Sequence, residues 1–461
     1  MDWIITPARA SAAAALLASY ALLCGGIAWQ RARLRQAGRR EQQDLQTGGP
    51  AVLVAYASQT GQAEALAHAT AHVLHTGGCA VRLLPVQSVT LAELQAHPRS
   101  LWLLSTTGEG DAPDHALPFV RGLLSRAAPL AGHQGRVLAL GDSAYAQFCA
   151  FGLRVQHWLQ AQGAKADAVC MDNGDAAALH DWQTGVAELL HALTGQAAAG
   201  WRAPDAPRPW TLRRRTHLNP GSQGGPVYLL EWVPESGPLP AWESGDLAAL
   251  TVPADPGRPR DYSIASIPQD GSLHLLVRQS QRADGTPGAA SGWLCQGMAV
   301  GGSLPLSLRA HSGFRLGDNA ARPLVLIGNG TGLAGLASHI RARAAQGRGD
   351  QWLLFGERSP DHDALLDPQL RQWLAQGQLA RLDRAWSRPG TGQAGQPGYV
   401  QHLLAREAAA LRDWVARGAA LYVCGSQQGM AQGVDTALRQ ALGNAQVDAL
   451  AAEGRYRRDV Y

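Results

Sequence analysis

The residues with the clearest chemical signature lie between an apolar segment at 52–56 and a helical pattern at about 63–74. The apolar segment is typical of a buried strand. The residues between them offer hydroxyl groups and free backbone N–H groups where a helix begins: Ser58, Gln59, Thr60, Gly61 and Gln62. These N–H groups and the helix dipole favour a bound phosphate. A P-loop for nucleoside triphosphates would need a lysine and a different glycine spacing, so this loop better suits a tightly held flavin mononucleotide (FMN).

Two further loops that contain glycine follow later apolar runs and could contact a flat ring system. The first follows residues 101–105 and contains Thr106, Thr107, Gly108, Glu109 and Gly110. The second follows residues 137–140 and contains Leu140, Gly141, Asp142, Tyr145, Phe148 and Cys149. Glycine lets backbone N–H groups approach a ring closely, and Tyr145 could stack on an isoalloxazine. Each loop alone could be an ordinary turn between a strand and a helix, but the three together predict a flavin site.

Another group of chemically suited residues lies near the middle of the chain. Arg260 can bind a pyrophosphate, Tyr262 can face a flavin ring, and Ser263 can reach the reactive edge of that ring. A run of small residues before a predicted helix offers a second diphosphate cradle, and it consists of Gly288, Ala289, Ala290 and Ser291.

The last third of the chain carries a third kind of loop, a cysteine and a polar tail. Gly330, Thr331 and Gly332 follow an apolar strand and open a helix, although a lone match to GxGxxG is a weak signal. Cys424 ends a buried strand, where a structural thiol is the common outcome. Residues 454–461 read GRYRRDVY, and a frayed terminus would be the default interpretation.

Strands and helices must position these residues. Predicted strands at 52–55, 81–84, 101–105, 137–140 and 166–170 alternate with helices, so residues 51–193 are expected to form a doubly wound parallel sheet that binds ligands beyond its strand ends. Residues 194–209 are rich in Ala, Pro and Gly and predict a hinge. Alternating runs at 227–233 and 273–277 predict an antiparallel barrel over 210–320. Strands at 324–327, 352–355, 379–383 and 421–424 predict a second nucleotide-binding α/β domain over 321–461.

The N-terminal segment has a different character. Residues 10–29 are uncharged, rich in Ala and Leu, and long enough to span a bilayer. Arg9 alone precedes them, whereas Arg31, Arg33, Arg35, Arg39 and Arg40 follow. The positive-inside rule then predicts an anchor at 1–30, a tether at 31–50, and catalytic domains on the cytoplasmic side of the inner membrane in a single-pass protein. A cleaved signal peptide is the alternative, but its charge would lie on the wrong side.

Composition excludes several function classes. The chain has 461 residues and a net charge of +4 with a pI near 8.8, which is too mild to indicate a nucleic-acid partner. The cysteines are scattered without a CxxC motif, so no zinc or iron–sulfur site is expected. Scattered thiols fit a reducing compartment.

The motifs STTGEGDAP and LGDSAYAQFC give residues 51–193 a resemblance to the flavodoxin-type FMN domain of the diflavin reductases, closest to the sulfite reductase flavoprotein. The pair RDYSIAS and GAASGWL resembles the FAD barrel of the ferredoxin–NADP reductase superfamily, and GNGTGLAG resembles the phosphate loop of the same reductases. The fold that this resemblance implies is α/β, with a flavodoxin-like sheet followed by a ferredoxin–NADP reductase-like module. A large connecting region that relatives insert in the barrel does not fit here.

The resemblance also implies roles for individual residues. Residues 58–62 would hold the FMN phosphate, and loops 106–111 and 141–149 would hold its ring. Ser263, Cys424 and Asp459 would form the polar set at hydride transfer, and Tyr461 would cover the FAD ring. The NADPH 2′-phosphate would meet Ser387 and Arg388, followed by Tyr399 and Gln401. NADPH is therefore favoured over NADH, and the implied cofactors are FMN, FAD and NADPH.

The sequence departs from the family pattern at three positions. Thr107 stands where microsomal relatives have a stacking tyrosine, Gly335 replaces a proline, and Pro397 replaces a lysine that contacts phosphate. Three functions remain open: a membrane-anchored NADPH diflavin reductase that serves a heme or siroheme protein, a ferric-chelate reductase in iron uptake, and a non-catalytic electron-transfer docking subunit. The last alternative rests only on Gly335 and Pro397.

Overall fold

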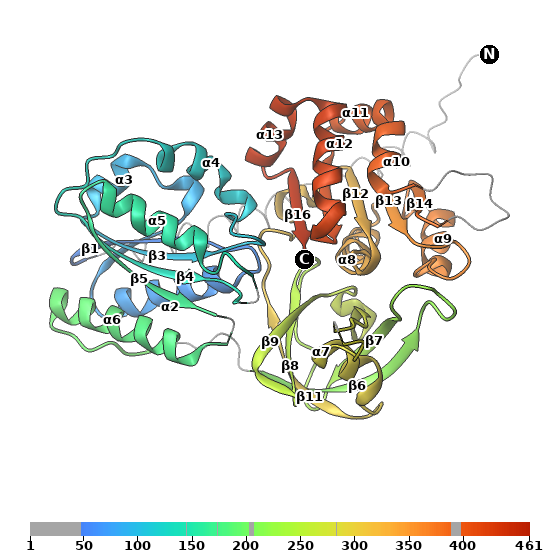
Figure 1. Ribbon diagram of the computed structural model, residues 1–461, viewed down its shortest axis with the longest axis horizontal. Coiled ribbons are helices and arrows are strands. Elements are labelled where there is room, and N and C mark those ends of the chain that lie inside the picture. The colour runs from blue at the N-terminus through green and yellow to red at the C-terminus, as the bar shows by residue number, and fades with distance from the viewer. Residues whose placement is uncertain (1–47, 144, 173, 202–206, 283, 389–397) are drawn as a thin grey trace, which may run out of the picture.

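The computed structural model describes residues 48–461 except 144, 173, 202–206, 283 and 389–397. Within this range the chain forms three sheets in sequence order (Figure 1). The first and third are parallel and covered by helices on both faces, and the second is antiparallel.

The first sheet is the predicted doubly wound sheet, with strand order β2-β1-β3-β4-β5. Its strands are β1 (Ala51–Ala57), β2 (Ala80–Pro85), β3 (Arg99–Ser105), β4 (Gln134–Leu140) and β5 (Lys165–Met171). Side chains of β1 alternate between two hydrophobic clusters, with Val52 and Val54 facing one and Leu53 and Ala55 the other. Both faces are therefore buried, which explains why the strand sequence is apolar throughout.

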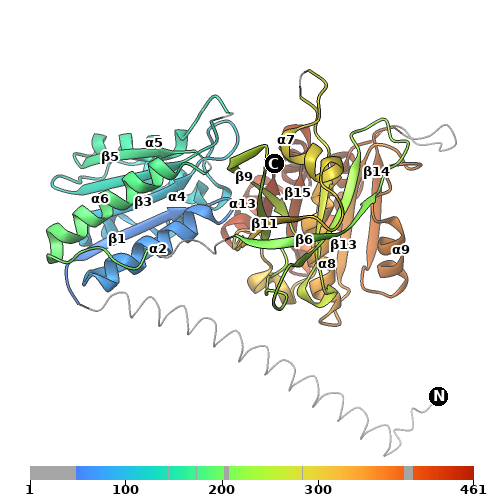
Figure 2. The same ribbon diagram turned by 90° about the horizontal axis from the view of Figure 1, so that it is seen from below.

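Helices cover the two faces of this sheet (Figures 1 and 2). One face packs against α2 (Gln62–Thr76) and α6 (Ala176–Thr194). The other packs against α4 (Leu117–Arg121) and α5 (Ala150–Ala161), with the short α3 (Leu91–Ala96) beside them. All three candidate flavin loops leave the carboxyl ends of strands, so they share one edge of the sheet.

The second sheet is antiparallel, with strand order β10-β7-β6-β11-β8-β9. Its strands are β6 (Arg208–His217), β7 (Val227–Pro234), β8 (Leu247–Val252), β9 (Asp255–Ser263), β10 (Leu273–Arg278) and β11 (Ser303–Arg309). A bridge between Ile264 and Leu275 brings the ends of the strand order together, which confirms the predicted barrel. The short helix α7 (Ala289–Gly292) follows β10.

The third sheet is parallel, with strand order β14-β13-β12-β15-β16. Its strands are β12 (Leu324–Asn329), β13 (Gln351–Glu357), β14 (Arg381–Trp386), β15 (Ala420–Gly425) and β16 (Tyr456–Val460). Helices α8 (Leu333–Ala344) and α9 (Asp367–Ala375) pack on one face. The opposite face packs against α10 (Val400–Arg406), α11 (Ala408–Ala416), α12 (Gln432–Leu442) and α13 (Asn444–Ala452).

The C-terminal tail is ordered rather than frayed, because it adds β16 in parallel to β15. In Figure 1 the C-terminus lies where the three parts of the molecule meet. The strand expected at 379–383 is shifted to Arg381–Trp386, since the buried Leu379 packs against the core just before the strand begins.

The predicted boundary regions remain predictions. Helix α6 ends at Thr194 and β6 begins at Arg208, so the expected hinge at 194–209 overlaps the start of β6. Residues 202–206 of that hinge lie outside the described residues. The anchor at 1–30 and most of the tether at 31–50 also lie outside them.

The predicted localisation, a single pass through the inner membrane, is wrong on the structural finding. Among the residues that the structure describes, no helix is both long enough and apolar enough to cross a bilayer. The longest of these helices, α6, spans 19 residues and carries Asp181 and Glu188. The prediction depended on residues 10–29, which the structure does not describe.

Candidate active site

The loop at 58–62 has the geometry of an anion cradle. Gly61 caps the start of α2 with a φ of 84°, a left-handed conformation that glycine adopts without strain. The Ser58 backbone N–H donates to Nε2 of His115 at 3.4 Å. Burial lowers the pKa of His115, against the nearby Glu64 and Asp114 carboxylates, so that its ring tends to stay neutral and can accept. The Ser58 hydroxyl is buried without a hydrogen-bond partner, which fits a group that binds a ligand phosphate.

The loop at 106–111 also leaves polar groups for a ligand. Thr107 pairs with Asp111 through the main chain at 2.8 Å, yet its buried hydroxyl oxygen has no hydrogen-bond partner. Gly108 and Gly110 have φ values of 50° and 112°. Thr106 accepts a hydrogen bond from the Phe151 N–H at 3.3 Å, which ties this loop to the start of α5. The exposed Glu109 lies at the tip of the turn.

The third loop, at 141–149, is held between β4 and α5. Cys149 is fully buried in a left-handed conformation with a φ of 59°, and its thiol donates to the Ala139 carbonyl at 3.0 Å. A Cβ on Gly141 would lie 2.7 Å from the Cys149 backbone nitrogen, so the close approach requires glycine. Tyr145 is 38% exposed and free to cover a ring, whereas Phe148 is half-buried. These features fit the FMN that the sequence predicts.

The predicted FAD residues lie on β9 and at α7. Arg260, past the middle of β9, donates to Asp255 at the start of the strand at 3.0 Å, and Tyr262 is half-buried further along it. Near α7, a Cβ on Gly288 would lie 2.1 Å from the Ser280 hydroxyl oxygen, which itself hydrogen-bonds to that of Ser291 at 2.8 Å. A side chain at position 288 would therefore displace this pair of hydroxyl groups, and the close packing fits a close-lying diphosphate.

The three residues predicted at hydride transfer lie together, although they come from β9, β15 and β16. Ser263 and Cys424 both contact the carboxylate of Asp459. The Ser263 hydroxyl donates to Oδ2 of Asp459 at 2.8 Å. The Cys424 thiol lies 3.6 Å from the same oxygen, and the two strands place Cys424 and Asp459 directly side by side. All three residues are buried. Burial, together with the charge and hydrogen bond of Asp459, raises the pKa of the Cys424 thiol well above its ordinary value, so Cys424 acts as a neutral donor.

The terminal residue joins this cluster to the glycine loop at 330–332. The Tyr461 N–H donates to the Gly425 carbonyl at 3.1 Å, and its hydroxyl lies 3.3 Å from Oγ1 of Thr331. Gly330 has a φ of 55°, and Gly332 lies so close to β15 that a Cβ would be 2.1 Å from the Cys424 carbonyl oxygen. Tyr461 is 54% exposed, so it lies at the surface of the cluster rather than inside it.

The residues predicted at the 2′-phosphate lie at the end of β14 and the start of α10. Ser387 and Arg388 bond through their N–H groups to the carbonyls of Glu357 and Arg358, which leaves the Arg388 side chain exposed. Tyr399 is exposed at the start of α10, and Gln401 lines a pocket of about 450 Å³ between α10 and α12. Pro397 lies outside the described residues.

We expect Arg388→Ala to raise the KM for NADPH by about 10- to 100-fold and to leave the KM for NADH nearly unchanged. The reason is that the guanidinium binds the 2′-phosphate dianion of NADPH, which NADH lacks. Hydrogen bonds between charged groups are stronger than those between neutral groups. Steady-state reduction of an artificial acceptor with both nucleotides checks this. Arg371→Ala removes an exposed arginine of α9 whose Nε bonds to Asp367 at 2.6 Å, and it is the control. Equal changes for both nucleotides would contradict the assignment.

The first sheet packs against the other two parts through its ligand edge. Asp142, in the third loop, forms an ion pair with Arg258 of β9. Asp114, just beyond the second loop, accepts hydrogen bonds from both Nε and Nη2 of Arg458 on β16, and the Nε contact measures 2.7 Å. The Gln59 side chain donates to the Arg458 carbonyl at 3.3 Å. The three candidate flavin loops therefore face the parts that carry the other predicted sites.

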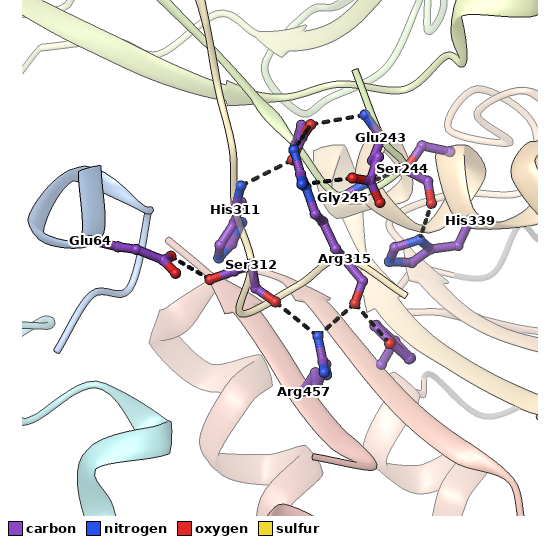
Figure 3. A network of polar contacts seen from close by, with 12 residues as sticks. Glu64, Glu243, Ser244, Gly245, His311, Ser312, Arg315, His339 and Arg457 are labelled. Atoms are coloured by element: carbon purple, nitrogen blue, oxygen red, sulfur yellow. Dashed lines mark hydrogen bonds and ion pairs between the residues drawn. The ribbon is translucent and has the colours of Figure 1, made fainter. Parts of the chain in front are cut away.

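A network of polar contacts extends this interface to the loop after β11 (Figure 3). The Ser312 hydroxyl donates to Glu64 of α2 at 2.5 Å, and Arg457 donates to the Ser312 carbonyl at 2.9 Å. Arg315 in the same loop binds Asp246 at 2.6 Å. The network thus connects α2 with β16 and with the barrel.

Sequence reasoning singled out Gln59 and Asp142 but missed the other residues that make these contacts. Asp114 and His115 follow the predicted loop 106–111, and Arg458 lies inside the quoted tail, but nothing in either segment indicates the other. The partners Asp114 and Arg458 are 344 positions apart. Only a covarying pair of positions among related sequences would supply a signal for such a contact.

Comparison with known proteins gives a consistent result. Residues 54–187 match the flavodoxin family, and residues 326–436 match the oxidoreductase NAD-binding domain family. The sulfite reductase (NADPH) flavoprotein alpha-component of Neisseria meningitidis serogroup A is 27% identical over 554 residues, which cover 90% of this chain and 91% of the relative. The corresponding proteins of Vibrio parahaemolyticus and Shewanella oneidensis are both 26% identical, covering 88% and 89% of this chain and 86% and 89% of those relatives. The alignment of 554 positions exceeds the 461 residues of this chain, so the relatives contain segments that it lacks.

Proposed function

Since this chain belongs to the diflavin reductase family and is an NADPH-dependent flavoprotein reductase with FMN and FAD as cofactors, we propose that it delivers electrons from NADPH to a heme or siroheme protein. The observation that carries the proposal is the convergence of Ser263, Cys424 and Asp459, with Tyr461 bonded to Thr331 beside them. The relatives named as sulfite reductase flavoproteins support the choice of acceptor.

When bound, FAD would supply a hydride acceptor and FMN would supply single-electron release, so that the protein could connect a two-electron donor to a one-electron acceptor. The residues of the chain hold the nicotinamide and the flavin in place and supply the charge that stabilises the reacting nicotinamide. Asp459 presents a buried carboxylate toward the positive charge that develops on a nicotinamide, and Ser263 and Cys424 hold that carboxylate in place through hydrogen bonds. Tyr461 covers the site and must move aside before a nicotinamide can enter.

Each of the three parts of the molecule carries the residues that would bind one cofactor. Residues 58–62 would hold the FMN phosphate, while loops 106–111 and 141–149 would hold its ring. Arg260, Tyr262 and residues 288–291 would hold FAD, and residues 330–332 with Ser387, Arg388, Tyr399 and Gln401 would hold NADPH. The orphaned Ser58 and Thr107 hydroxyls support the first of these assignments.

Purified protein tests the proposal directly. We expect a yellow protein with equal amounts of FMN and FAD, which reduces cytochrome c with NADPH. Reduction of a siroheme or heme protein at a rate well above that of a ferric chelate supports the acceptor class. A faster rate with the ferric chelate would overturn it, and a colourless protein that takes up neither flavin would overturn the whole proposal.

We expect Cys424→Ala to slow flavin reduction by NADPH about tenfold and to leave flavin content unchanged. The thiol is a neutral donor at 3.6 Å from Asp459, and removal of one weak donor loosens the carboxylate without exposing it. Stopped-flow absorbance of flavin bleaching measures this rate. Cys295→Ala, which removes another buried thiol, serves as the control, and equal rates in the parent and Cys424→Ala would remove Cys424 from the mechanism.

A further inference from the structure

Consecutive residues of strand β16 contact two different regions, the hydride-transfer cluster and the flavodoxin-like part. Asp459 contributes the carboxylate of the hydride-transfer cluster, and the Tyr461 hydroxyl contacts Thr331 of the loop at 330–332. The preceding residue, Arg458, contacts the flavodoxin-like part instead. Because successive side chains of a strand point to opposite faces, one short strand can touch both sites at once.

The contact between Arg458 and Asp114 has the geometry of a specific attachment. Two guanidinium nitrogens meet the two carboxylate oxygens of Asp114, and such bidentate pairs fix orientation as well as distance. The side chains are 25% and 33% exposed. Burial lowers the pKa of Arg458, but the hydrogen bonds and charge of Asp114 outweigh that effect and raise it above its ordinary value.

Two more contacts attach the same strand to the flavodoxin-like part. Gln59, within the candidate FMN phosphate loop, donates to the Arg458 carbonyl at 3.3 Å. Arg457 reaches Glu64 of α2 indirectly, through the Ser312 carbonyl and hydroxyl (Figure 3). The main chain of β16 is therefore held directly from the FMN side at Arg458, and the side chain of Arg457 connects to that side through Ser312, just before the residues that form the hydride-transfer site.

A strand at the edge of a sheet can transmit a small displacement along its length. Among the described strands, β16 pairs with β15 alone, so its other side is free of ladder hydrogen bonds. The terminal Tyr461 is attached through its N–H to Gly425 and through its carbonyl to the Gln427 N–H at 3.0 Å. If Tyr461 moves to admit a nicotinamide, these bonds and the adjoining strand must adjust, and a bidentate pair tolerates little change.

We propose that Arg458 is a positioning residue that couples the seating of the C-terminal strand to the docking of the flavodoxin-like part on the reductase module. The inference rests on the proposed function, because it assigns Tyr461 the movement that admits NADPH. Displacement of Tyr461 weakens the contact between Arg458 and Asp114 and favours release of the flavodoxin-like part. In the opposite direction, docking through Asp114 stabilises β16 and keeps Tyr461 in place, as reciprocal coupling requires.

The interface offers a matched control. Arg121 of α4 forms an ion pair with Asp448 of α13 at 3.5 Å, and these side chains are 61% and 43% exposed. This pair also bridges the two parts, but it is monodentate and more exposed, and its acidic partner lies on α13 rather than on β16. Exposed pairs of this kind contribute little, so Arg121→Gln separates a general loss of interface charge from the loss of the specific contact.

The test uses the full chain with both flavins bound, in the parent and in Asp114→Asn, Arg458→Gln, Arg458→Lys and Arg121→Gln. Hydrogen–deuterium exchange of the peptide at 455–461 is the main measurement. We expect Asp114→Asn, a change in the other part of the molecule, to raise exchange in this peptide severalfold, and Arg121→Gln to leave it unchanged. Unchanged exchange in Asp114→Asn, or an equal rise in Arg121→Gln, would overturn the proposal.

Small-angle X-ray scattering supplies the second measurement. We expect the ratio of extended to compact particles to rise about tenfold in Arg458→Gln and less in Arg458→Lys, which keeps the charge but loses the bidentate fork. We also expect NADP⁺ to increase this ratio in the parent and to have little further effect in Asp114→Asn. An NADP⁺ response of the same size in both proteins would overturn the coupling.

The two proposals fail in different ways. Asp114 lies outside the residues assigned to hydride transfer, so NADPH-driven flavin bleaching in Asp114→Asn should stay within twofold of the parent. Protein without flavins, or without NADPH-driven bleaching in the parent, would refute the proposed function. Normal bleaching together with unchanged exchange and scattering in Asp114→Asn would refute the coupling alone.

Discussion

Replacement of Asp459 by asparagine is expected to slow flavin reduction by NADPH by on the order of 10²- to 10³-fold, the range found when one preorganised electrostatic group is removed. Asp459 is the single acceptor that Ser263 and Cys424 share, at 2.8 and 3.6 Å. Its negative charge lies in a buried site, where charge interactions are much stronger than in water. Asparagine keeps the shape but removes the charge that stabilises a cationic nicotinamide.

The measurement for Asp459→Asn is single-turnover bleaching of the flavins with NADPH under anaerobic conditions. Flavin content should match that of the parent, because Asp459 lies outside the cradles assigned to the flavin phosphates. Asp413→Asn, on the exposed face of α11, controls for a general change of charge. Reduction at the parent rate would show that the cluster is structural and that hydride transfer occurs without this carboxylate.

Much of the fold could be predicted because its signals are local. The runs at 52–55 and 137–140 became strands β1 and β4, since both faces of each strand are buried and the sequence shows this as continuous apolar residues. The loops 58–62 and 330–332 could be placed because each follows such a run directly and precedes a helix. In both loops a glycine meets a backbone atom that excludes any Cβ, the Ala310 carbonyl at Gly61 and the Cys424 carbonyl at Gly332.

The convergence of the hydride-transfer residues could not be derived from spacing. Ser263 lies 196 positions from Asp459 in the chain, and neither residue has a neighbour that identifies the other. Resemblance to a family was the only route to this set from the sequence. The Arg458 contact with Asp114 had no such route, because it depends on how two parts of the molecule that carry different sheets pack together. The localisation prediction was wrong for another reason, since it relied on the composition of residues 10–29 and on the arginines around them, whereas no helix among the described residues is long and apolar enough to cross a bilayer.

The glycine at 332 gives a second large expected effect. Its φ is −57°, so another residue could adopt the backbone conformation. The difficulty is space, since an added Cβ would lie 2.1 Å from the Cys424 carbonyl oxygen and 2.4 Å from the Cys424 carbonyl carbon. These are backbone atoms of a buried strand, so they cannot rotate away as a flexible side chain would. Gly332→Ala must therefore push the loop at 330–332 away from β15, or distort β15 at Cys424.

Either displacement affects the candidate NADPH site, because Thr331 holds the Tyr461 hydroxyl and Cys424 belongs to the hydride-transfer cluster. A misplacement of about 1 Å can reduce catalysis about 10²-fold. We expect Gly332→Ala to lower both NADP⁺ affinity and flavin reduction by about this factor, as measured by calorimetry and by bleaching of the flavins. FMN content should be unchanged, since the FMN cradle belongs to another sheet.

Gly257→Ala provides the control for Gly332→Ala, because an added Cβ there meets no atom within 4 Å. NADP⁺ binding with the parent affinity in Gly332→Ala would mean that the nucleotide phosphates lie elsewhere. Weak NADP⁺ binding together with an unchanged single-turnover rate at saturating NADPH would place the loop in binding alone and leave Cys424 undisturbed. If both NADP⁺ affinity and the single-turnover rate fall, the loop at 330–332 and Cys424 belong to one site. The contact between Gly332 and the Cys424 carbonyl fixes their relative position.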